Sequence, residues 1–169
     1  MPASAASVTG LLERELSELA DSRVVNHVRS LLIAPRCEMR AWDYGKPGVE
    51  FPCWLVLAHP TSNTAIAYCE QGFGLTMPWG LLLLSGDTHM SMGMDSSWFE
   101  RFLEAYFDSK ASTEMPIWQV LKHRGKDYPG QVVTPEGSWD GTWAEVMRLR
   151  ASNDGFRYDC GQSVYRRDA

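Results

Sequence analysis

The sequence has no hydrophobic run that is long enough to cross a membrane. Its longest stretch without a charged residue covers residues 71–86, which contain one proline and four glycines. A membrane-spanning helix needs about 20 apolar residues in a row. The first residues, MPASAAS, also contain neither the basic segment nor the apolar segment of a secretory signal. From these absences we expect a cytoplasmic protein without a membrane partner.

Cysteine is scarce, and its spacing matches no metal-binding motif. None of the four cysteines belongs to a C-x-x-C pair, which argues against a zinc site built on paired thiols. In a reducing compartment such cysteines stay as thiols, and a buried thiol packs like a small apolar side chain. We therefore expect reduced cysteines, no metal and no cofactor. The four residues are Cys37, Cys53, Cys69 and Cys160.

Basic residues are too few for a general affinity for nucleic acid. The chain of 169 residues has 16 basic and 21 acidic side chains, so its formal net charge is -5. Binding to a phosphate backbone depends on a basic face, and we therefore expect no nucleic-acid partner. The hydrophobic content of 44% is ordinary for a globular protein. No stretch has the composition of a linker, so we predict a single domain over residues 1–169.

The spacing of apolar residues predicts an α+β fold. Between residues 9 and 33 apolar side chains recur mostly every three or four positions, as in an amphipathic helix that Asp21 could divide in two. Short apolar runs separated by turn residues follow, which is typical of strands. They cover residues 37–44, 53–58, 64–69 and 81–84. We predict an N-terminal helical segment followed by an antiparallel sheet of four to six strands.

A further helix is predicted near residues 96–109, where it would cover one face of the sheet. Ser97 and Glu100 have the spacing of a capping box, which satisfies the first free N–H groups of a helix. From residue 98 onward, large apolar side chains recur at the helical period. These are Trp98, Phe99, Phe102, Leu103, Tyr106 and Phe107.

The pattern is weaker in the C-terminal part of the chain, where glycine, proline and aspartate interrupt it. A short helix is expected over residues 114–123. Residues 143–149 fit a helix or a strand equally well, and a last strand is expected within residues 156–165.

Two groups of residues ahead of the 96–109 helix resemble catalytic sites. His-Met-Ser-Met-Gly at residues 89–93 falls one glycine short of the nucleophile elbow G-x-S-x-G, and Ser91 lies too far beyond the preceding strand for that motif. Asp87, His89 and Asp95 could serve as acid, base or metal ligands, although none has the i, i+4 spacing of a zinc-binding helix. A small hydrolase or metal-dependent enzyme with its site at these three residues is the alternative interpretation.

Acidic residues are concentrated in the middle of the chain. Residues 61–120 hold 2 basic and 7 acidic side chains, a net charge of -5 that equals the net charge of the whole chain. Within this segment three acidic residues recur every four positions, so on a helix they line one face, where each like-charge pair costs roughly 0.2–0.5 kcal/mol. A charged patch also accelerates association with a partner of opposite charge. We predict that a basic protein binds at Asp95, Glu100, Glu104, Asp108 and Glu114.

Self-association is a third interpretation. Met90, Met92 and Met94 precede Trp98, and flexible methionines together with tryptophan are common at interface cores. This segment is the predicted contact face of a homodimer.

Two short segments carry a resemblance to known proteins. At residues 78–82, Pro-Trp-Gly-Leu-Leu, and at residues 93–99, Gly-Met-Asp-Ser-Ser-Trp-Phe, the chain resembles small uncharacterised bacterial proteins. In size, acidity and aromatic content it is also similar to immunity proteins, which neutralise a cognate toxin by binding it. The resemblance assigns no role to any residue. It implies a non-enzymatic protein-binding domain that captures a basic partner such as a toxin.

Overall fold

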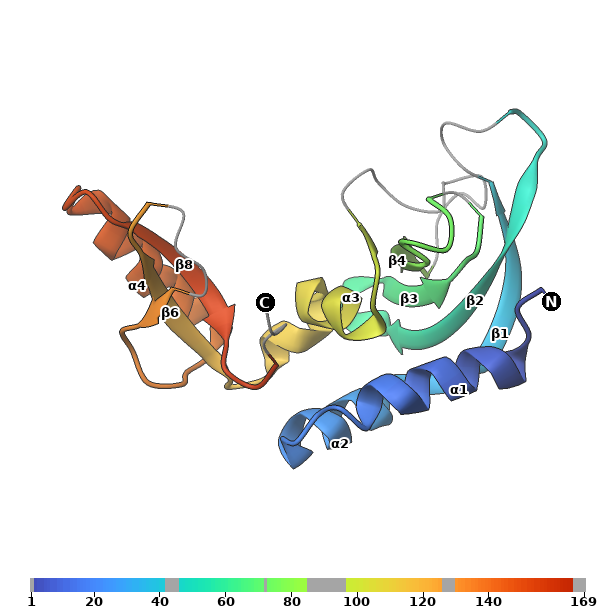
Figure 1. Cartoon of the computed structure of the whole chain (residues 1–169), viewed down its shortest axis with the longest axis horizontal. Coiled ribbons are helices and arrows are strands. Elements are labelled where there is room, and N and C mark those ends of the chain that lie inside the picture. The colour runs from blue at the N-terminus through green and yellow to red at the C-terminus, as the bar shows by residue number, and fades with distance from the viewer. Residues whose placement is uncertain (1, 42–45, 72, 85–96, 126–129, 166–169) are drawn as a thin grey trace. The chain divides into compact units, whose positions relative to one another are not determined.

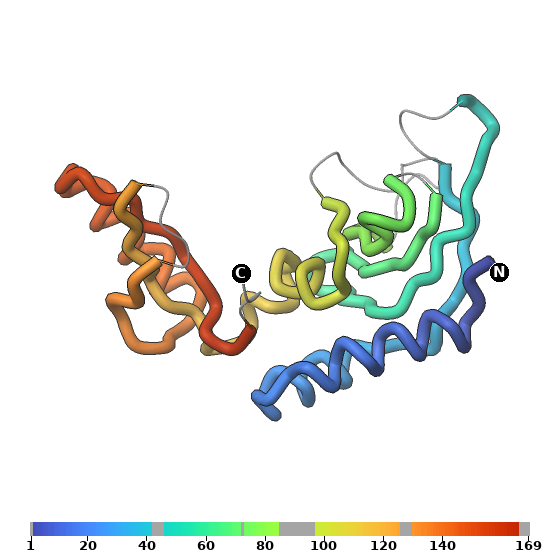
Figure 2. Tube along the Cα trace, in the orientation of Figure 1, coloured from blue at the N-terminus to red at the C-terminus, as the bar shows by residue number. Residues whose placement is uncertain are grey.

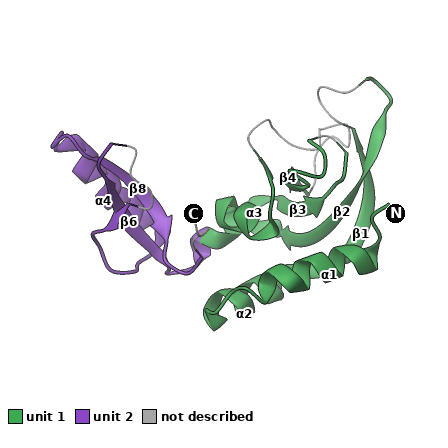
Figure 3. Ribbon diagram, in the orientation of Figure 1, with its two compact units in different colours: residues 1–112 green, residues 113–169 purple. Residues whose placement is uncertain are grey.

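The computed structural model of the chain describes residues 2–41, 46–71, 73–84, 97–125 and 130–165. The chain forms two compact units, Met1–Ser112 and Thr113–Ala169 (Figure 3). Each unit has its own sheet and its own buried cluster, so the predicted α+β fold with N-terminal helices and an antiparallel sheet is confirmed. The single domain over residues 1–169 stays a prediction, because compactness alone does not say whether the two units unfold together.

Unit 1 begins with two helices, α1 (Ala5–Leu16) and α2 (Ser22–Leu31). Ser4 caps α1 by accepting a hydrogen bond from the N–H of Ser7 at 3.2 Å, and Asp21 caps α2. The predicted division at Asp21 is therefore confirmed. Both helices bury the apolar side chains that recur at helical spacing. These are Val8, Leu12 and Leu16 in α1, and Val24 and Val28 in α2.

An antiparallel sheet of five strands follows, and its spatial order is the order along the chain. Its members are β1 (Leu32–Ala41), β2 (Glu50–His59), β3 (Thr64–Tyr68), β4 (Trp79–Leu83) and β5 (Trp98–Phe99). Figure 2 shows the trace turning back on itself from each strand to the next between β1 and β4. A 3₁₀ turn, η1 (Pro60–Ser62), joins β2 to β3, and Asn63 closes it in the left-handed region with a φ of 56°.

The two faces of this sheet are covered by different elements. Helices α1 and α2 run along one face (Figure 1). Helix α3 (Phe102–Asp108) begins on the same side, where the ring of Phe102 packs against Trp79 with 5.4 Å between the ring centroids. Gly80 faces the opposite side, where a Cβ atom would come within 2.7 Å of the Trp98 ring, so only glycine allows this close approach. The buried cluster on that side contains Cys53, Leu55, Ala65, Ala67, Cys69, Leu82 and Trp98.

Helix α3 is shorter than the helix predicted near residues 96–109. Trp98 and Phe99 pair with Gly80 and Trp79 as strand β5, so the helix begins only at Phe102. Two consecutive aromatic residues fit the helical period and the strand period equally well, which explains the error at this end. A 3₁₀ helix, η2 (Lys110–Glu114), follows α3.

Unit 2 contains a sheet of three antiparallel strands in the order β7–β6–β8. The central strand is β6 (Trp118–His123), with β7 (Gln131–Val132) and β8 (Arg157–Gln162) beside it, and α4 (Trp139–Ala151) packs on β6 and β8. The helix expected over residues 114–123 is therefore wrong, because its second half pairs with strands on both sides. The last expected strand is confirmed as β8. Residues 143–149, which fitted a helix or a strand, belong to helix α4. Val120, Val146 and Tyr158 form the buried core.

Candidate interaction surface

Part of the predicted chemistry falls outside the described residues. Asp95 lies there, and so do Asp87 and His89 of the alternative catalytic site and the three methionines of the expected dimer face. The alternative enzyme therefore stays a prediction. Within the part of the chain that the structure describes, no three side chains of His, Cys, Asp or Glu are grouped so that they could hold a metal ion. No helix in that part is long and apolar enough to cross a lipid bilayer.

The other predicted acidic residues lie on three different segments. Glu100 is exposed in the bend between β5 and α3, whereas Glu104 and Asp108 lie four residues apart on α3 and therefore on one side of it. Glu114 is the last residue of η2 and belongs to unit 2. The structure thus brings Glu104 and Asp108 together and places Glu100 just ahead of their helix. We call Glu100, Glu104 and Asp108 the acidic face.

The first turn of α3 is capped from a distant helix. The carboxylate of Glu15 accepts hydrogen bonds from the N–H groups of Phe102 and Leu103, both at 3.1 Å. Glu104 accepts a third hydrogen bond, from the N–H of Arg101 at 3.3 Å. These carboxylates accept hydrogen bonds from N–H groups that have no partner within the helix. Their negative charge also interacts favourably with the positive end of the helix dipole. The capping box expected at residues 97–100 is therefore wrong.

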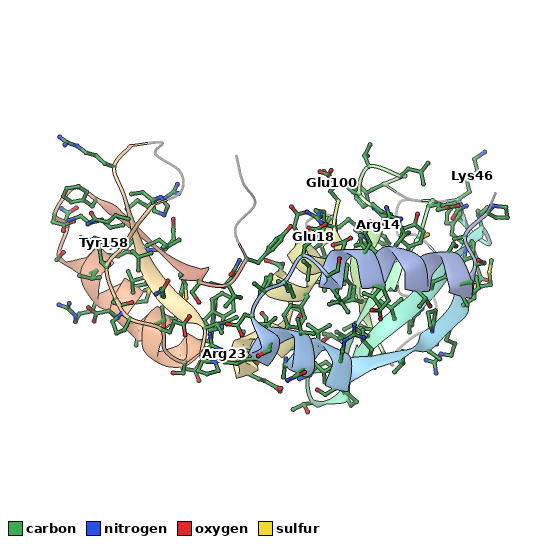
Figure 4. All side chains as sticks on the ribbon, turned by 60° about the horizontal axis from the view of Figure 1, so that its bottom comes forward. Arg14, Glu18, Arg23, Lys46, Glu100 and Tyr158 are labelled. Atoms are coloured by element: carbon green, nitrogen blue, oxygen red, sulfur yellow. The ribbon has the colours of Figure 1, made fainter. Side chains whose placement is uncertain are left out.

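Two acidic residues near the end of α1 contact Arg101, the residue that precedes α3. Glu18 forms an ion pair with Arg101, and Glu15 approaches the same guanidinium, with an Nε–Oε2 distance of 3.7 Å. In the view of Figure 4, Glu18 and Glu100 lie near the C-terminal end of α1. The sequence carries no signal for the role of Glu15 and Glu18, because their contacts with residues 101–103 span more than 80 positions and leave no local pattern.

The surroundings of Glu15 disfavour its charge. Its side chain is only 12% exposed, and burial raises the pKa of Glu15 above its ordinary value. The two N–H donors and Arg101 act in the opposite direction, since they stabilise the carboxylate. Burial has the larger effect, so this cap holds its negative charge less readily than an exposed glutamate does.

Asp108 is the acidic residue with the least favourable position. It is exposed at the last residue of α3, where the helix dipole is negative, and no cation pairs with it among the described residues. Neighbouring atoms still remove part of its hydration, and this desolvation raises the pKa of Asp108. The ionised carboxylate of Asp108 therefore lowers the stability of the free chain, and a cation supplied by another molecule would stabilise it.

Polar contacts also fix the helices that carry these carboxylates. The imidazole Nδ1 of His27 on α2 lies 2.7 Å from the hydroxyl of Tyr106, which is fully buried on α3. Arg29 on α2 donates two hydrogen bonds to Glu13 on α1, at 3.0 and 2.7 Å. Helix α3, which carries Glu104 and Asp108, is therefore linked to α2, and α2 is linked to α1.

Two of the four cysteines, Cys53 and Cys160, are poor nucleophiles at neutral pH. All four are thiols: Cys53 and Cys69 are fully buried, Cys160 is half-buried and Cys37 is exposed. Contact with Cys69 and burial raise the pKa of Cys53, and burial raises the pKa of Cys160 to about 11. A thiol with a raised pKa is a poor nucleophile at neutral pH. The buried pair packs among apolar side chains of the sheet, as expected for small apolar residues.

No family model matches the chain, and neither a curated protein nor a solved structure is significantly similar to it.

Proposed function

We propose that the chain is a non-enzymatic protein-binding domain and that its acidic face holds a basic protein partner. The observation that carries this proposal is the division of charge between the units. Unit 1 holds 8 basic and 13 acidic residues, whereas unit 2 holds 8 of each, so the net charge of -5 belongs to unit 1. A surface of one sign steers a partner of the opposite sign and raises the association rate.

The arrangement of ion pairs supports the same proposal. Several carboxylates of unit 1 are already neutralised by arginine, as in the pairs Glu13–Arg29, Asp21–Arg23 and Glu18–Arg101. Asp108 is different, because no cation pairs with it in the described part of the chain and the helix dipole opposes it. A carboxylate that lowers the stability of the free chain is explained if a bound cation offsets this cost. An immunity protein, which the chain resembles in size and acidity, binds a toxin; a basic toxin is the kind of partner we propose.

Glu100 and Asp108 are the residues at which this proposal is best tested. Reversal of Glu104 would also remove the hydrogen bond that it accepts at the start of α3. The double variant Glu100→Lys and Asp108→Lys raises the net charge by four without removing that bond. Glu50→Lys with Asp140→Lys is the matched control, since both residues are exposed, lie outside the acidic face and give the same change of charge.

The experiment immobilises the wild-type chain and both double variants and exposes them to an extract of the native host. Bound proteins are identified by mass spectrometry, and the association rate of each basic one is then measured with purified material. We expect the acidic-face variant to associate about 10-fold more slowly than the wild type at low ionic strength, and the difference to shrink as salt is added. The control variant keeps the wild-type rate. Equal rates for the two double variants, or no basic protein on the wild type, would contradict the proposal.

A further inference from the structure

Strand β8 is an outer strand of the sheet in unit 2, and we call the side that faces away from β6 its open side. Among the described residues it pairs only with β6. In an antiparallel strand, the N–H and C=O groups of successive residues point alternately to the two sides. The N–H of Ser163 donates to the C=O of Ile117 in the chain entering β6, which fixes this alternation. The backbone groups that point to the open side are those of Tyr158, Cys160 and Gln162.

A side chain covers one of these groups and leaves the others open. Arg150, near the end of α4, donates Nε–H to the C=O of Tyr158 at 2.7 Å and Nη2–H to the carboxylate of Asp159 at 2.8 Å. The N–H and C=O of Cys160 have no hydrogen-bond partner within the described ranges. Backbone groups that are unpaired at a sheet edge are a template for another strand.

Helix α4 has a strip of three large apolar side chains and one arginine, which we call the α4 flank. It consists of Trp139, Trp143, Met147 and Arg150, which recur every three or four residues. Trp143 is 40% exposed and Met147 is 50% exposed. The Trp143 ring stacks on Trp139 at 6.0 Å, and the Arg150 guanidinium lies 5.4 Å from the Trp143 ring. Trp139 packs on Trp118 of the central strand β6, with 4.6 Å between the ring centroids, whereas Arg150 reaches the open side of β8, so the α4 flank approaches the open edge at its Arg150 end.

We propose that a second copy of the chain fills both places, so that the protein is a symmetric dimer joined through β8. The two β8 strands pair in antiparallel orientation with Cys160 opposite Cys160 of the second copy, and two three-stranded sheets become one sheet of six strands. The two-fold axis is perpendicular to the sheet, which places both α4 helices on the same face. This dimer does not depend on the basic partner proposed for unit 1.

The side chains of β8 are complementary to themselves in this register. With Cys160 at the two-fold axis, Tyr158 lies opposite Gln162 and Asp159 lies opposite Gly161, so no like charges face each other. The N–H of Gln162 of the second copy then takes the place of Arg150 at the C=O of Tyr158. A shift of one hydrogen-bonded pair in one direction would set Asp159 opposite Asp159 of the second copy, and like charges that face each other across strands are destabilising. The same shift in the other direction would leave Tyr158 beyond the end of the second β8.

The expected spacing of the two helices also favours a second copy as the occupant. Neighbouring strands lie about 4.8 Å apart. Because α4 packs on both β6 and β8, we place the axis of α4 between these two strands, about half a strand spacing inside β8. The two-fold axis lies about half a strand spacing outside β8, which sets the two α4 axes about 10 Å apart, a normal distance for packed helices. Trp143 and Met147 of each copy then lie between the helices and lose their exposure.

Sedimentation equilibrium of the full chain from about 1 µM to about 1 mM tests this dimer. Cys160→Pro removes an N–H that points to the open side, so it blocks pairing with a second copy, while the N–H groups that bond to β6 belong to neighbouring residues and remain. Met147→Lys places a charge between the helices. Met39→Lys is the matched control, because Met39 is 53% exposed and lies on β1 in unit 1. Circular dichroism checks the fold of each variant.

We expect a wild-type dimer whose dissociation constant rises at least about 10-fold in Cys160→Pro and in Met147→Lys and is unchanged in Met39→Lys. If Cys160→Pro does not fold, Met147→Lys alone decides. A wild type that is monomeric over the whole range, or a dimer that the folded variants do not weaken, overturns the proposal. The double variant at Glu100 and Asp108 is expected to dimerise like the wild type, so the two proposals can fail separately.

Discussion

At the scale of single residues, Glu15 connects packing, capping and charge in unit 1. It is a residue of α1, yet its carboxylate completes the first turn of α3 and lies beside Arg101. Burial nevertheless makes this carboxylate expensive to ionise, and the balance between the two effects sets its pKa. The consequence is a dependence of stability on pH that can be assigned to one side chain.

The sign of that dependence follows from the raised pKa of Glu15. The folded chain binds this proton more tightly than the unfolded chain does. The contribution of Glu15 to stability is therefore complete below the ordinary pKa of 4.5 and is lost as the pH rises through the raised value. We expect the free energy of unfolding of the wild type, relative to Glu15→Gln, to fall over this interval in urea titrations at a series of pH values.

Glu13 provides the control for this prediction, because Arg29 lowers the pKa of Glu13. Its contribution is present above the ordinary pKa and is lost as the pH falls, so the wild type relative to Glu13→Gln should show a slope of opposite sign. A stability difference for Glu15→Gln that rises with pH would show that its cap outweighs its burial.

At the scale of secondary-structure elements, one hydrogen bond links α2 to α3. His27 and the buried hydroxyl of Tyr106 lie 2.7 Å apart. Tyr106→Phe keeps the ring and removes the bond, so we expect the free energy of unfolding to fall by about 1 kcal/mol. A double-mutant cycle with His27→Leu, measured by chemical denaturation, isolates the pairwise energy. A coupling energy of zero would mean that apolar packing alone holds the two helices together.

The elements that were predicted from the sequence are those whose signal is local. The apolar stripe of α1 and α2, the cap at Asp21 and the short strands depend on neighbours within a few positions, and all are present. The predicted start of α3 was wrong because the cap of this helix comes from Glu15, which is far away in the sequence. The helix expected over residues 114–123 was wrong because pairing with β7 and β8, and not local period, decides the conformation of β6.

The candidate site was predictable to a similar extent. The concentration of acidic residues can be counted along the sequence, and the i, i+4 relation of Glu104 and Asp108 is realised on α3. The pairing of Arg101 with Glu18 depends on how α1 packs against α3, which no local pattern encodes. The strip on α4 was missed for a different reason. Residues 143–149 fitted a helix or a strand equally well, so the common flank of Trp139 and Trp143 becomes visible only when the helix and the edge strand beside it are known.

At the scale of the whole molecule, the two units have separate cores, and the single-domain prediction can be tested through them. Val146 is fully buried in unit 2. Val146→Ala removes two methyl groups from a packed core, which usually costs about 1–3 kcal/mol. We expect faster amide hydrogen exchange in β6 and β8 and unchanged exchange in β2 to β4, measured by mass spectrometry after proteolysis. Faster exchange in both units would show that they unfold as one domain.

The cap that Glu15 provides for α3 also has a consequence for the order of folding. A helix of seven residues is too short to be stable alone, so its first turn depends on a carboxylate that lies 87 positions earlier in the chain. Closing so long a loop is slow compared with forming a local turn. During synthesis the carboxylate of Glu15 can therefore accept its hydrogen bonds only after almost all of unit 1 has been made. We expect α3 to be among the last parts of that unit to become ordered.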